Sequence, residues 1–465
     1  MPSRFQPRDW VVAAVIAVVA GALRAVSLNV PSRALLDEFW YARDGCFYWR
    51  ASVEACGMAG LVPPDRDVAT WIATYGELTP EHPPLAKWLI GAPMAVLDYG
   101  AGVGRLSSLL VGVATVFLLY LLVRRLSGST AIAAIAALLL AVDFLHFVHS
   151  RIAMLDVFTG FFAVAAVLFV TLDRDQSVLR EAGAAAHRWW RAAAAVAAGC
   201  AAATKLSGAA VVMGVVVLMV LWAFDTRRNS SGRDPKFIAR LAAAAGGVVG
   251  IAAVTYLLTY IGRVDGAILA IPWEEGSWLH AWWGRQAYML DFYATGPSGA
   301  SQPWQVPMMS PSLAYLLEDS PDGIREVLLF GNPLLWWGGF VAGGVALVDW
   351  LRRGPNGRPE VVVIGFLATY AGWLSLSLTG RPVHLYHAVP VAPFLYLALA
   401  HVVRRAWPLG PARVLVSAAV VASIVTFGFY FPILTALPLD RAAWEPRGCS
   451  AMTLWPSDVD GCGLE

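Results

Sequence analysis

Two adjacent carboxylates, Asp37 and Glu38, stand directly after the first long apolar run of the sequence, residues 10–28. Like charges side by side raise the pKa of one carboxyl group, which suits a general base. Three aromatic residues follow the pair and would hold it at a membrane interface. A carboxylate that is simply solvated at the membrane surface is the plain alternative.

Cationic residues recur where later helices are predicted to begin. His82 and Lys87 flank a Pro-Pro pair, which fixes the backbone at a helix start, and an ordinary helix start is the alternative interpretation. Arg105 opens the next apolar run, where an arginine by itself usually snorkels to the interface. Lys205 precedes Ser207, a candidate N-cap, and a helix N-terminus beside a cation can bind an anion.

Two more polar groups are predicted at the same end of the helices. Arg151 and Asp156 bracket a chain turn, and ionisable residues at membrane depth usually face a cavity or a partner. A structural Arg151–Asp156 ion pair is an equally weighted alternative. Arg381 can bind phosphate in a bidentate manner, and His384 and His387 are neighbours at helical spacing, although membrane histidines are more often packed than catalytic.

These residue types suit one particular chemistry. Cations at membrane depth suit a phosphate attached to a lipid, and a carboxylate above them suits the activation of an acceptor hydroxyl. No histidine or cysteine spacing resembles a zinc site. The sequence therefore predicts one site that combines a carboxylate base with several cations.

The elements that must position this site are membrane helices. Only 14% of the 465 residues are charged and 58% are hydrophobic, whereas a soluble domain has about 25% charged residues. The first run is too long for a signal peptide, and the lack of a basic tail or soluble domain argues against nucleic-acid binding. An all-α polytopic protein is predicted, with eleven spans of about 20 residues each. The predicted spans are 10–29, 106–123, 130–148, 152–172, 190–204, 207–224, 238–260, 333–350, 361–379, 383–403 and 412–432.

The charge of the links predicts the topology. Every second link is basic, as the positive-inside rule requires of cytoplasmic links, so the N-terminus is predicted inside and the C-terminus outside. The interrupted apolar stretch 84–99 is predicted as a juxtamembrane or re-entrant helix, because a full span there would turn the basic links outward. The catalytic membrane domain is predicted over 1–432, with outside segments at 30–105 and 261–332 and an outside tail at 433–465. The basic residues of the cytoplasmic links are Arg124, Arg125, Arg174, Arg180, Arg188, Arg227, Arg228, Arg233, Lys236, Arg352, Arg353, Arg358, Arg404 and Arg405.

Cysteine positions agree with this topology. Cys46 and Cys56 share the first outside segment, and Cys449 and Cys462 share the tail. Local pairs in an oxidising compartment predict two disulfides, with free thiols as the alternative. Cys200 lies alone in a helix.

Taken in order, the motifs resemble the protein O-mannosyltransferases over nearly the whole chain. The motifs that carry the resemblance are Leu36-Asp37-Glu38, His82-Pro83-Pro84-Leu85-x-Lys87, Ser150-Arg151-x-x-x-Leu155-Asp156, Thr204-Lys205-x-Ser207-Gly208, Ser301-x-Pro303-Trp304, Gly331-Asn332-Pro333-x-x-Trp336-Trp337 and Arg381 to His387. The resemblance implies the GT-C glycosyltransferase fold. It also implies inverting transfer of mannose from a polyprenyl-phosphate to Ser or Thr of secreted proteins, at the extracytoplasmic face of the plasma membrane.

The resemblance also implies roles for individual residues. Asp37 would be the base and Glu38 its support, while Arg105, Lys205 and Arg381 would hold the lipid phosphate. The supporting residues would be His82, Lys87, Arg151, Asp156, His384 and His387, with Trp304 in the acceptor loop. Phosphate is a good leaving group, so neither a metal nor a cofactor is predicted. Besides the lipid-linked donor, the expected partners are secreted acceptor proteins, membrane lipids and the translocon.

The chain departs from the family pattern in three places. It lacks the inserted lectin-like domain of eukaryotic members, and Ala86 replaces an expected glycine. The stretch 294–300 lacks an expected histidine, which leaves acceptor contacts open. Two alternatives remain: a GT-C enzyme with another sugar or a lipid or glycan acceptor, and a membrane transporter. The absence of internal repeats and the polar residues gathered at one face argue against transport.

Overall fold

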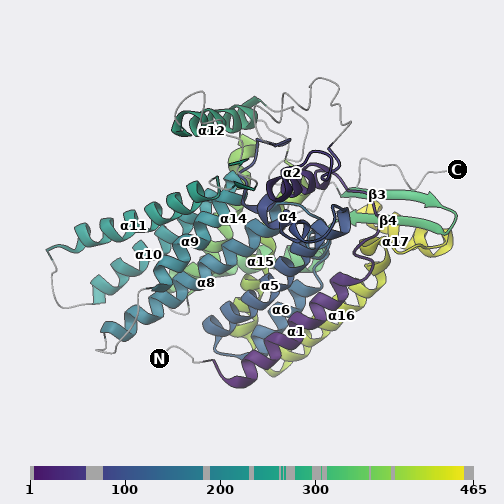
Figure 1. Ribbon diagram of the computed structural model, residues 1–465. Coiled ribbons are helices and arrows are strands. Elements are labelled where there is room, and N and C mark those ends of the chain that lie inside the picture. The colour runs from purple at the N-terminus through teal and green to yellow at the C-terminus, as the bar shows by residue number, and fades with distance from the viewer. Residues whose placement is uncertain are drawn as a thin grey trace.

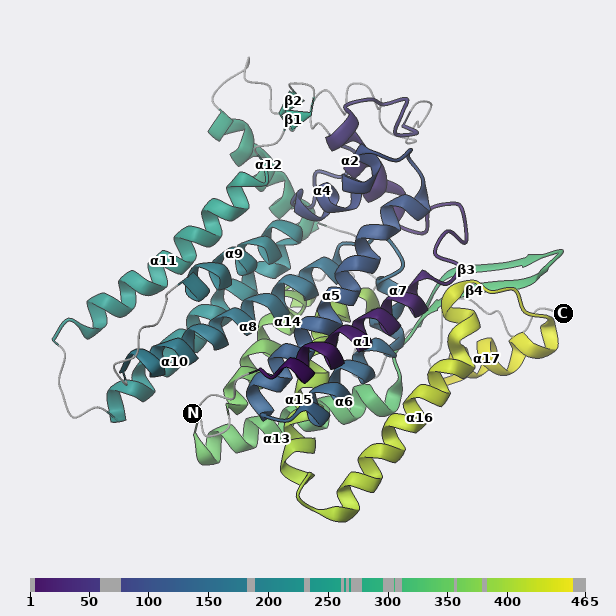
Figure 2. The same cartoon turned by 60° about the horizontal axis from the view of Figure 1, so that its bottom comes forward.

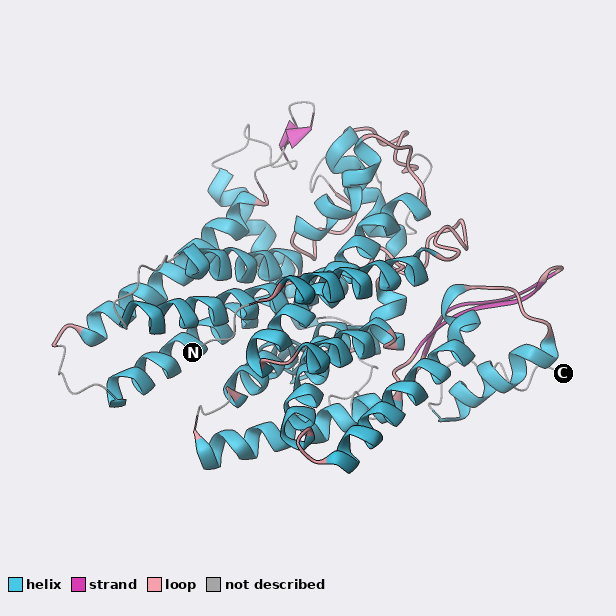
Figure 3. Ribbon diagram, turned by 90° about the horizontal axis from the view of Figure 1, so that it is seen from below, coloured by secondary structure: helices cyan, strands magenta, loops and turns pink. Residues whose placement is uncertain are grey.

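Helices make up most of the computed structural model, and short antiparallel hairpins are the other regular structure in its described part (Figures 1 and 3). The structure describes residues 5–58, 77–181, 189–229, 235–260, 263–264, 267–268, 278–295, 305, 312–354, 358–378 and 383–454. The all-α prediction is therefore correct for the body of the molecule and incomplete for the segment before residue 333.

Each of the eleven predicted apolar runs contains a helix. Within the described residues, seven helices are long and apolar enough to cross a membrane, among them α5, α8, α10 and α16, whereas α6 is short. Eleven crossings therefore stay a prediction. The bundle helices are α1 (Pro7–Ala25), α5 (Ala101–Ser127), α6 (Thr130–Ala141), α8 (Asp156–Glu181), α9 (Trp189–Thr204), α10 (Ala209–Asn229), α11 (Phe237–Leu258), α13 (Pro333–Arg353), α14 (Pro359–Leu378), α15 (Ala392–Ala406) and α16 (Gly410–Thr435).

The predicted span 130–148 is broken in the structure. Asp143 separates α6 from α7 (Phe144–His149) and caps α7, because its carboxylate accepts the backbone N–H of His146 at 2.7 Å. The same carboxylate accepts hydrogen bonds from Trp336 Nε1 at 2.7 Å and Tyr396 Oη at 2.6 Å. A buried acidic side chain with three donors from three elements thus replaces one turn of continuous helix.

Short elements gather over one end of the bundle, the end toward the top of Figure 1. The seven residues of α4 are too few to span a membrane, in agreement with the predicted juxtamembrane helix. The short elements are α2 (Glu38–Arg50), α4 (Leu85–Gly91), η1 (Ala92–Ala95), η2 (Leu206–Gly208), α12 (Trp278–Thr295) and η5 (Leu385–Val391).

A hairpin that the sequence analysis did not predict leads into α13. Strands β3 (Leu313–Ser320) and β4 (Gly323–Leu329) pair antiparallel around a turn in which Gly323 has φ +119°, a conformation that favours glycine. Beside α16 and α17 (Arg441–Leu454), the hairpin extends to the right in Figure 2, and Trp444 Nε1 donates to Glu326 at 2.7 Å. A much smaller pair, β1 (Arg263–Val264) and β2 (Ala267–Ile268), lies in the same predicted outside segment.

Ion pairs gather at the opposite end of the bundle. Arg124 at the end of α5 pairs with Asp9 of α1 at 2.9 Å. Asp175 near the end of α8 pairs with both Arg125 and Arg358. Basic residues from several predicted cytoplasmic links therefore lie together, as the alternation of links predicts, although the membrane side they face stays a prediction.

Candidate functional site

The two adjacent carboxylates point into different surroundings. Leu36 takes a positive φ of 46°, and Asp37 occupies the N-cap position of α2. Glu38 is fully buried and accepts four hydrogen bonds, two from Arg105 at 2.8 Å and one each from the N–H groups of Leu35 and Ala153 at 2.9 and 3.0 Å. All its acceptor capacity is directed at the protein, so Glu38 serves as a structural anchor for the start of α2.

Arg105 completes this anchor. Besides Glu38, its guanidinium donates to the carbonyl oxygens of Leu28, Pro31 and Arg33 at 2.8 to 3.0 Å. All five N–H donors are thus engaged, and the side chain is 1% exposed. For Arg105 the structure offers a positioning role in place of the predicted phosphate contact, because a phosphate would have to displace these partners.

Asp37 has far fewer partners than its neighbour. Its carboxylate receives one long hydrogen bond from Tyr41 Oη at 3.5 Å, and the residue is only partly buried. Burial raises the pKa of Asp37, while the nearby charges of Lys205 and His384 lower it and Asp156 raises it further. A partly exposed carboxyl group with a raised pKa and spare acceptor capacity can take a proton from a ligand.

Among the predicted phosphate ligands, Lys205 is the one whose surroundings fit the prediction best. It precedes η2 in extended conformation, and its Nζ lies 2.8 and 3.1 Å from the two carboxylate oxygens of Asp156, the first residue of α8. Its Nζ also lies 5.5 Å from the ring centroid of Tyr386. Both members of the pair are almost fully buried, so the ammonium group is fixed in orientation, and its charge acts electrostatically on Asp37.

The predicted alternative of an Arg151–Asp156 ion pair is wrong. Arg151 donates instead to the carbonyl oxygens of Arg24 and Val26 at 2.6 and 2.5 Å, and to that of Ser27 at 3.3 Å. These carbonyls belong to the end of α1, where the last C=O groups lack helical partners. Arg151 therefore caps α1, and Lys205 neutralises Asp156.

Element η5 brings the predicted histidine pair to the site. His384 and His387 are neighbours as predicted, with the His384 N–H donating to His387 Nδ1 at 3.1 Å. The ring of Tyr386 stacks on both, at centroid distances of 5.2 and 4.5 Å. A small cavity beside them is lined by Asp156, Ser207 and His387, among others. Arg381 precedes η5 and lies outside the described residues.

Tyr315 of β3 also belongs to this site and was not predicted from the sequence. Its hydroxyl lies 2.8 Å from His149 Nε2 at the end of α7, and its phenol interacts electrostatically with Tyr386, Asp156 and Asp37. Two apolar runs around Asp322-Gly323 are a signal for a hairpin and could have placed this tyrosine on a strand.

The remaining predicted supporting residues lie in the predicted first outside segment, residues 30–105. Lys87 is fully buried and contacts Glu77 at 2.6 Å, Asp44 at 3.2 Å and the carbonyl of Thr79. The ring of His82 lies edge-on to Tyr41, with centroids 5.7 Å apart. Lys87 thus joins α2 to residues 77–79, whereas His82 contacts Tyr41, which donates to Asp37.

A long-range ion pair connects α12 to this segment. Arg285 of α12 pairs with Glu77, which also accepts a hydrogen bond from Tyr48. The predicted second outside segment is therefore tied to the first one through buried charges. Trp304 of that segment, which is predicted to contact the acceptor, lies outside the described residues.

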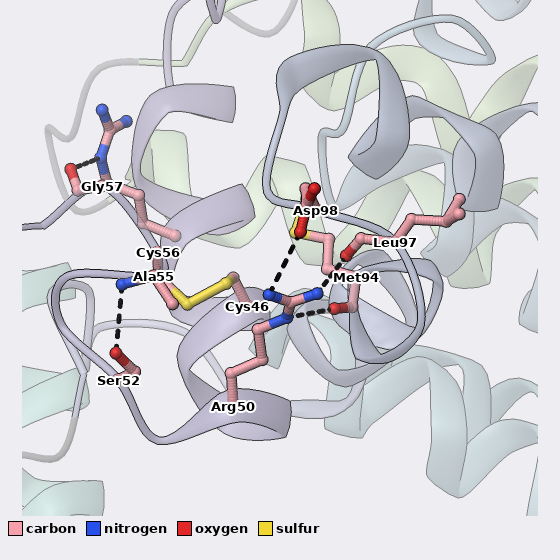
Figure 4. The surroundings of a disulfide bond; sticks show 10 residues. Cys46, Arg50, Ser52, Ala55, Cys56, Gly57, Met94, Leu97 and Asp98 are labelled. Atoms are coloured by element: carbon pink, nitrogen blue, oxygen red, sulfur yellow. Dashed lines mark hydrogen bonds and ion pairs between the residues drawn. A yellow bond between two sulfur atoms is a disulfide. The ribbon is translucent and has the colours of Figure 1, made fainter.

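Of the two predicted disulfides, the one between Cys46 and Cys56 is confirmed, and it closes the end of α2 (Figure 4). Nearby, Arg50 donates to the carbonyls of Met94 and Leu97, both at 2.6 Å. Cys449 is disulfide-bonded, and its predicted partner Cys462 lies outside the described residues. Within the described ranges, no three His, Cys, Asp or Glu side chains gather as metal ligands would.

Sequence comparison relates the chain to one enzyme family. The family model described as dolichyl-phosphate-mannose-protein mannosyltransferase matches residues 14–263. The polyprenol-phosphate-mannose–protein mannosyltransferase of Mycobacterium tuberculosis is 28% identical over 94% of this chain and 90% of its own length. The protein of the same name from Mycolicibacterium smegmatis is 29% identical over 96% and 93%.

Solved structures share the fold. One chain of the Saccharomyces cerevisiae protein O-mannosyltransferase Pmt1-Pmt2 complex, bound to the sugar donor, has a TM-score of 0.75 at 14% identity, covering 98% of this chain and 93% of that one. ArnT from Cupriavidus metallidurans, bound to undecaprenyl phosphate, has a TM-score of 0.54 at 19% identity, covering 90% and 64%. These likenesses establish the predicted GT-C type of fold for a multi-pass membrane protein.

Proposed function

The chain belongs to the dolichyl-phosphate-mannose-protein mannosyltransferase family, and on that premise we propose that it transfers mannose from a polyprenyl-phosphate to hydroxyl groups of proteins. The observation that carries the proposal is the partly exposed Asp37 carboxylate, whose pKa responds to the charges of the buried Lys205–Asp156 pair. This transfer requires a base that activates the acceptor hydroxyl and a cation that stabilises the leaving phosphate.

The proposed reaction is a single displacement. Asp37 accepts the proton of a Ser or Thr hydroxyl, and the oxygen forms a bond to C1 of mannose as the C1–O bond to phosphate breaks. The electron pair of that bond leaves with the polyprenyl phosphate, and the configuration at C1 is inverted. No redox partner is needed, since Asp37 holds the proton and the phosphate leaves as an anion.

Lys205 stabilises the negative charge that develops on the leaving phosphate. The ammonium group of Lys205 has three N–H donors, and two of them can bond the two carboxylate oxygens of Asp156. The third donor can therefore bond a phosphate oxygen. Arg381 is proposed as a second phosphate ligand. Metal-free chemistry remains a proposal that rests on the leaving-group quality of phosphate.

Glu38, Arg105 and Arg151 are proposed as positioning residues. They fix the start of α2 against α5 and the end of α1, and thereby set the direction of Asp37. Tyr315 and His149 would hold the hairpin against the same site. The segment 261–332, with Trp304, is proposed to bind acceptor chains as they leave the translocon.

The proposed topology puts Asp37 outside the cytoplasm of the plasma membrane, with eleven crossings and the C-terminus outside. Support comes from the ion pairs Asp9–Arg124, Asp175–Arg125 and Asp175–Arg358 at the end of the bundle away from α2 (Figure 1). Basic residues favour the cytoplasmic side. The membrane domain over 1–432 and the tail over 433–465 follow from the same topology.

The test is transfer by the purified protein from radiolabelled polyprenyl-phosphate-mannose to a Thr- and Pro-rich peptide. The matched control is the same peptide with every Ser and Thr replaced by Ala. Label in the first peptide alone supports the proposal. Label that requires another lipid-linked sugar, or that appears only on a glycan or lipid acceptor, would overturn it in favour of a different GT-C transferase.

A further inference from the structure

A second cavity lies at the other end of the bundle from Asp37. It has a volume of about 270 Å³ and is bounded by α8, α9, α10 and α11, which lie side by side in Figure 2. Its α8 wall includes Asp173, whereas the Lys205 site contains Asp156 at the start of the same helix. A helix rises 1.5 Å per residue, so these two carboxylates are separated by about 26 Å. The cavity is therefore distinct from the proposed catalytic site.

On α8 and α10 the lining changes from apolar to polar toward the helix ends. On α8 the order is Val170, then Asp173 and Arg174, and finally Ser177 toward the helix end. On α10, Met219 precedes Trp222, and Thr226 lies nearest the end. On α11, which runs the other way, Arg240 precedes Ala244. One half of the cavity thus suits a hydrocarbon chain, and the half at the helix ends suits a polar group.

The polar half carries excess positive charge. Its charged lining residues are three arginines, Arg174, Arg191 and Arg240, and one acid, Asp173. Arg191 pairs with Asp173 at 2.9 Å, and Arg174 donates to Thr226 Oγ1 at 2.6 Å and lies 3.6 Å from Asp225.

The rim adds a further cation and an aromatic ring. The Arg227 guanidinium lies 4.5 Å from the ring centroid of Phe237, which itself lines the cavity. Basic pockets between membrane helices at the cytoplasmic side bind anionic lipid headgroups, and the basic character of this end agrees with such a surface. An anion with an attached hydrocarbon chain would match both halves of the cavity.

We infer that this cavity binds an anionic phospholipid, with its phosphate headgroup among Arg174, Arg191 and Arg240 and an acyl chain against Val170, Met219 and Ala244. The arginine guanidinium groups supply charge-assisted hydrogen bonds to the phosphate oxygens. The bound lipid would brace α8, which begins at Asp156, and α9, which ends directly before Lys205. The inference does not depend on which sugar or acceptor the enzyme uses.

The experiment uses the full-length protein, stripped of lipid in detergent, and measures thermal unfolding and retained lipid by native mass spectrometry. Phosphatidylglycerol is compared with phosphatidylcholine and with inorganic phosphate. We expect phosphatidylglycerol to raise the melting temperature and to remain bound, whereas the zwitterionic lipid and the free ion have little effect. Equal stabilisation by both lipids, or none by phosphatidylglycerol, would overturn the inference.

Three variants locate the effect. Arg240→Gln removes one cation and Ala244→Phe fills the apolar half, so both should weaken phosphatidylglycerol binding by about tenfold or more. Arg352→Gln makes the same charge change on exposed surface of α13 and should bind as the wild type does. Unaltered binding by both cavity variants would contradict the assignment even if the lipid binds elsewhere. Mannose transfer by all three in saturating phosphatidylcholine reports whether the fold is intact.

Discussion

Asp37 and Glu38 are neighbours in sequence, yet they belong to two regions built on different principles. Around Glu38, a buried carboxylate is matched by Arg105 and two backbone N–H groups, and Arg105 is matched by three further carbonyls. Asp37 accepts one long hydrogen bond, from Tyr41, and the charges of Lys205, Asp156 and His384 act on it electrostatically. The first region is complete as it stands, whereas the second has spare acceptor capacity.

This contrast indicates which of the two neighbouring carboxylates takes part in the reaction. A carboxylate whose lone pairs are all used cannot accept a substrate proton without losing a buried partner, and leaving a buried charge unpaired is costly. A partly exposed carboxylate with few partners can accept one at little cost. We therefore expect substitutions of Glu38 and Arg105 to reduce stability first, and substitution of Asp37 itself to reduce activity first.

The largest loss of stability is expected for Arg105→Met. The change leaves Glu38 buried without its cation and strands three carbonyl groups, which should cost about 3–5 kcal/mol. Thermal unfolding in detergent is the measurement. The matched control is Arg33→Met, whose ion pair with Glu318 is exposed at 63% and 36% and should contribute no more than about 1 kcal/mol. Equal melting temperatures for the two variants would remove the structural role of Arg105.

A somewhat smaller loss of stability is expected from breaking the Cys46–Cys56 bridge. The two residues are 10 apart in sequence, and a crosslink of that span stabilises by about 3 kcal/mol in the chain-entropy view. The variant Cys46→Ser/Cys56→Ser should melt at a lower temperature yet keep its transfer rate below that temperature. A proportionate loss of rate at low temperature would show that this loop takes part in the reaction. Cys200→Ser, a change at a free cysteine, is the control.

In the Asp37 region, Lys205→Gln should weaken the action of the enzyme on the donor, and it should also lower the melting temperature, because it leaves the buried Asp156 without its cation. Losing one charge-assisted contact to phosphate is worth about 2–3 kcal/mol, so kcat/KM for the donor should fall roughly 30- to 150-fold. Lys205→Arg should recover part of this loss, because it restores the charge. If kcat/KM falls for the acceptor peptide but not for the donor, Lys205 binds the acceptor and its assignment to the phosphate is wrong.

The smallest effect is a displacement of the pH profile. Transfer needs deprotonated Asp37, and burial raises the pKa of this group above its usual value of 3.8 while Lys205 opposes the rise. The acid limb of kcat/KM should therefore lie above pH 3.8 in the wild type and move to still higher pH in Lys205→Gln. If the acid limb of Lys205→Gln stays in place or moves to lower pH, the group that titrates in this limb is not Asp37.

The helices were largely predictable because apolar runs of span length are a strong local signal. All eleven runs contain a helix, and the short helix at Leu85–Gly91 was expected from the interrupting Gly91 and Pro93. The break at Asp143 was not, since it depends on Trp336 and Tyr396 from helices nearly 200 residues or more away. The β3–β4 hairpin was not predicted, because the whole segment 261–332 was interpreted as a long loop.

The site was predictable in residue type and less so in pairing. Asp37, Lys205 and the two histidines were singled out. In the structure, Lys205 and the histidines lie around Tyr386, and the charges of Lys205 and His384 act on Asp37. Nearness in sequence suggested Arg151 as the alternative partner of Asp156, whereas Lys205 reaches it across 49 residues and Arg151 turns to the end of α1. Charge pairing across helices depends on packing, which a linear pattern does not contain.

The central claim is that Asp37 reacts and Glu38 supports, and one paired measurement tests it. Asp37→Asn and Glu38→Gln are purified side by side, and initial transfer rate, donor binding and melting temperature are measured on the same samples. Asp37→Asn should lose at least about 1,000-fold in rate with donor binding and melting temperature unchanged, whereas Glu38→Gln should lower the melting temperature markedly. Wild-type turnover by Asp37→Asn would contradict the account.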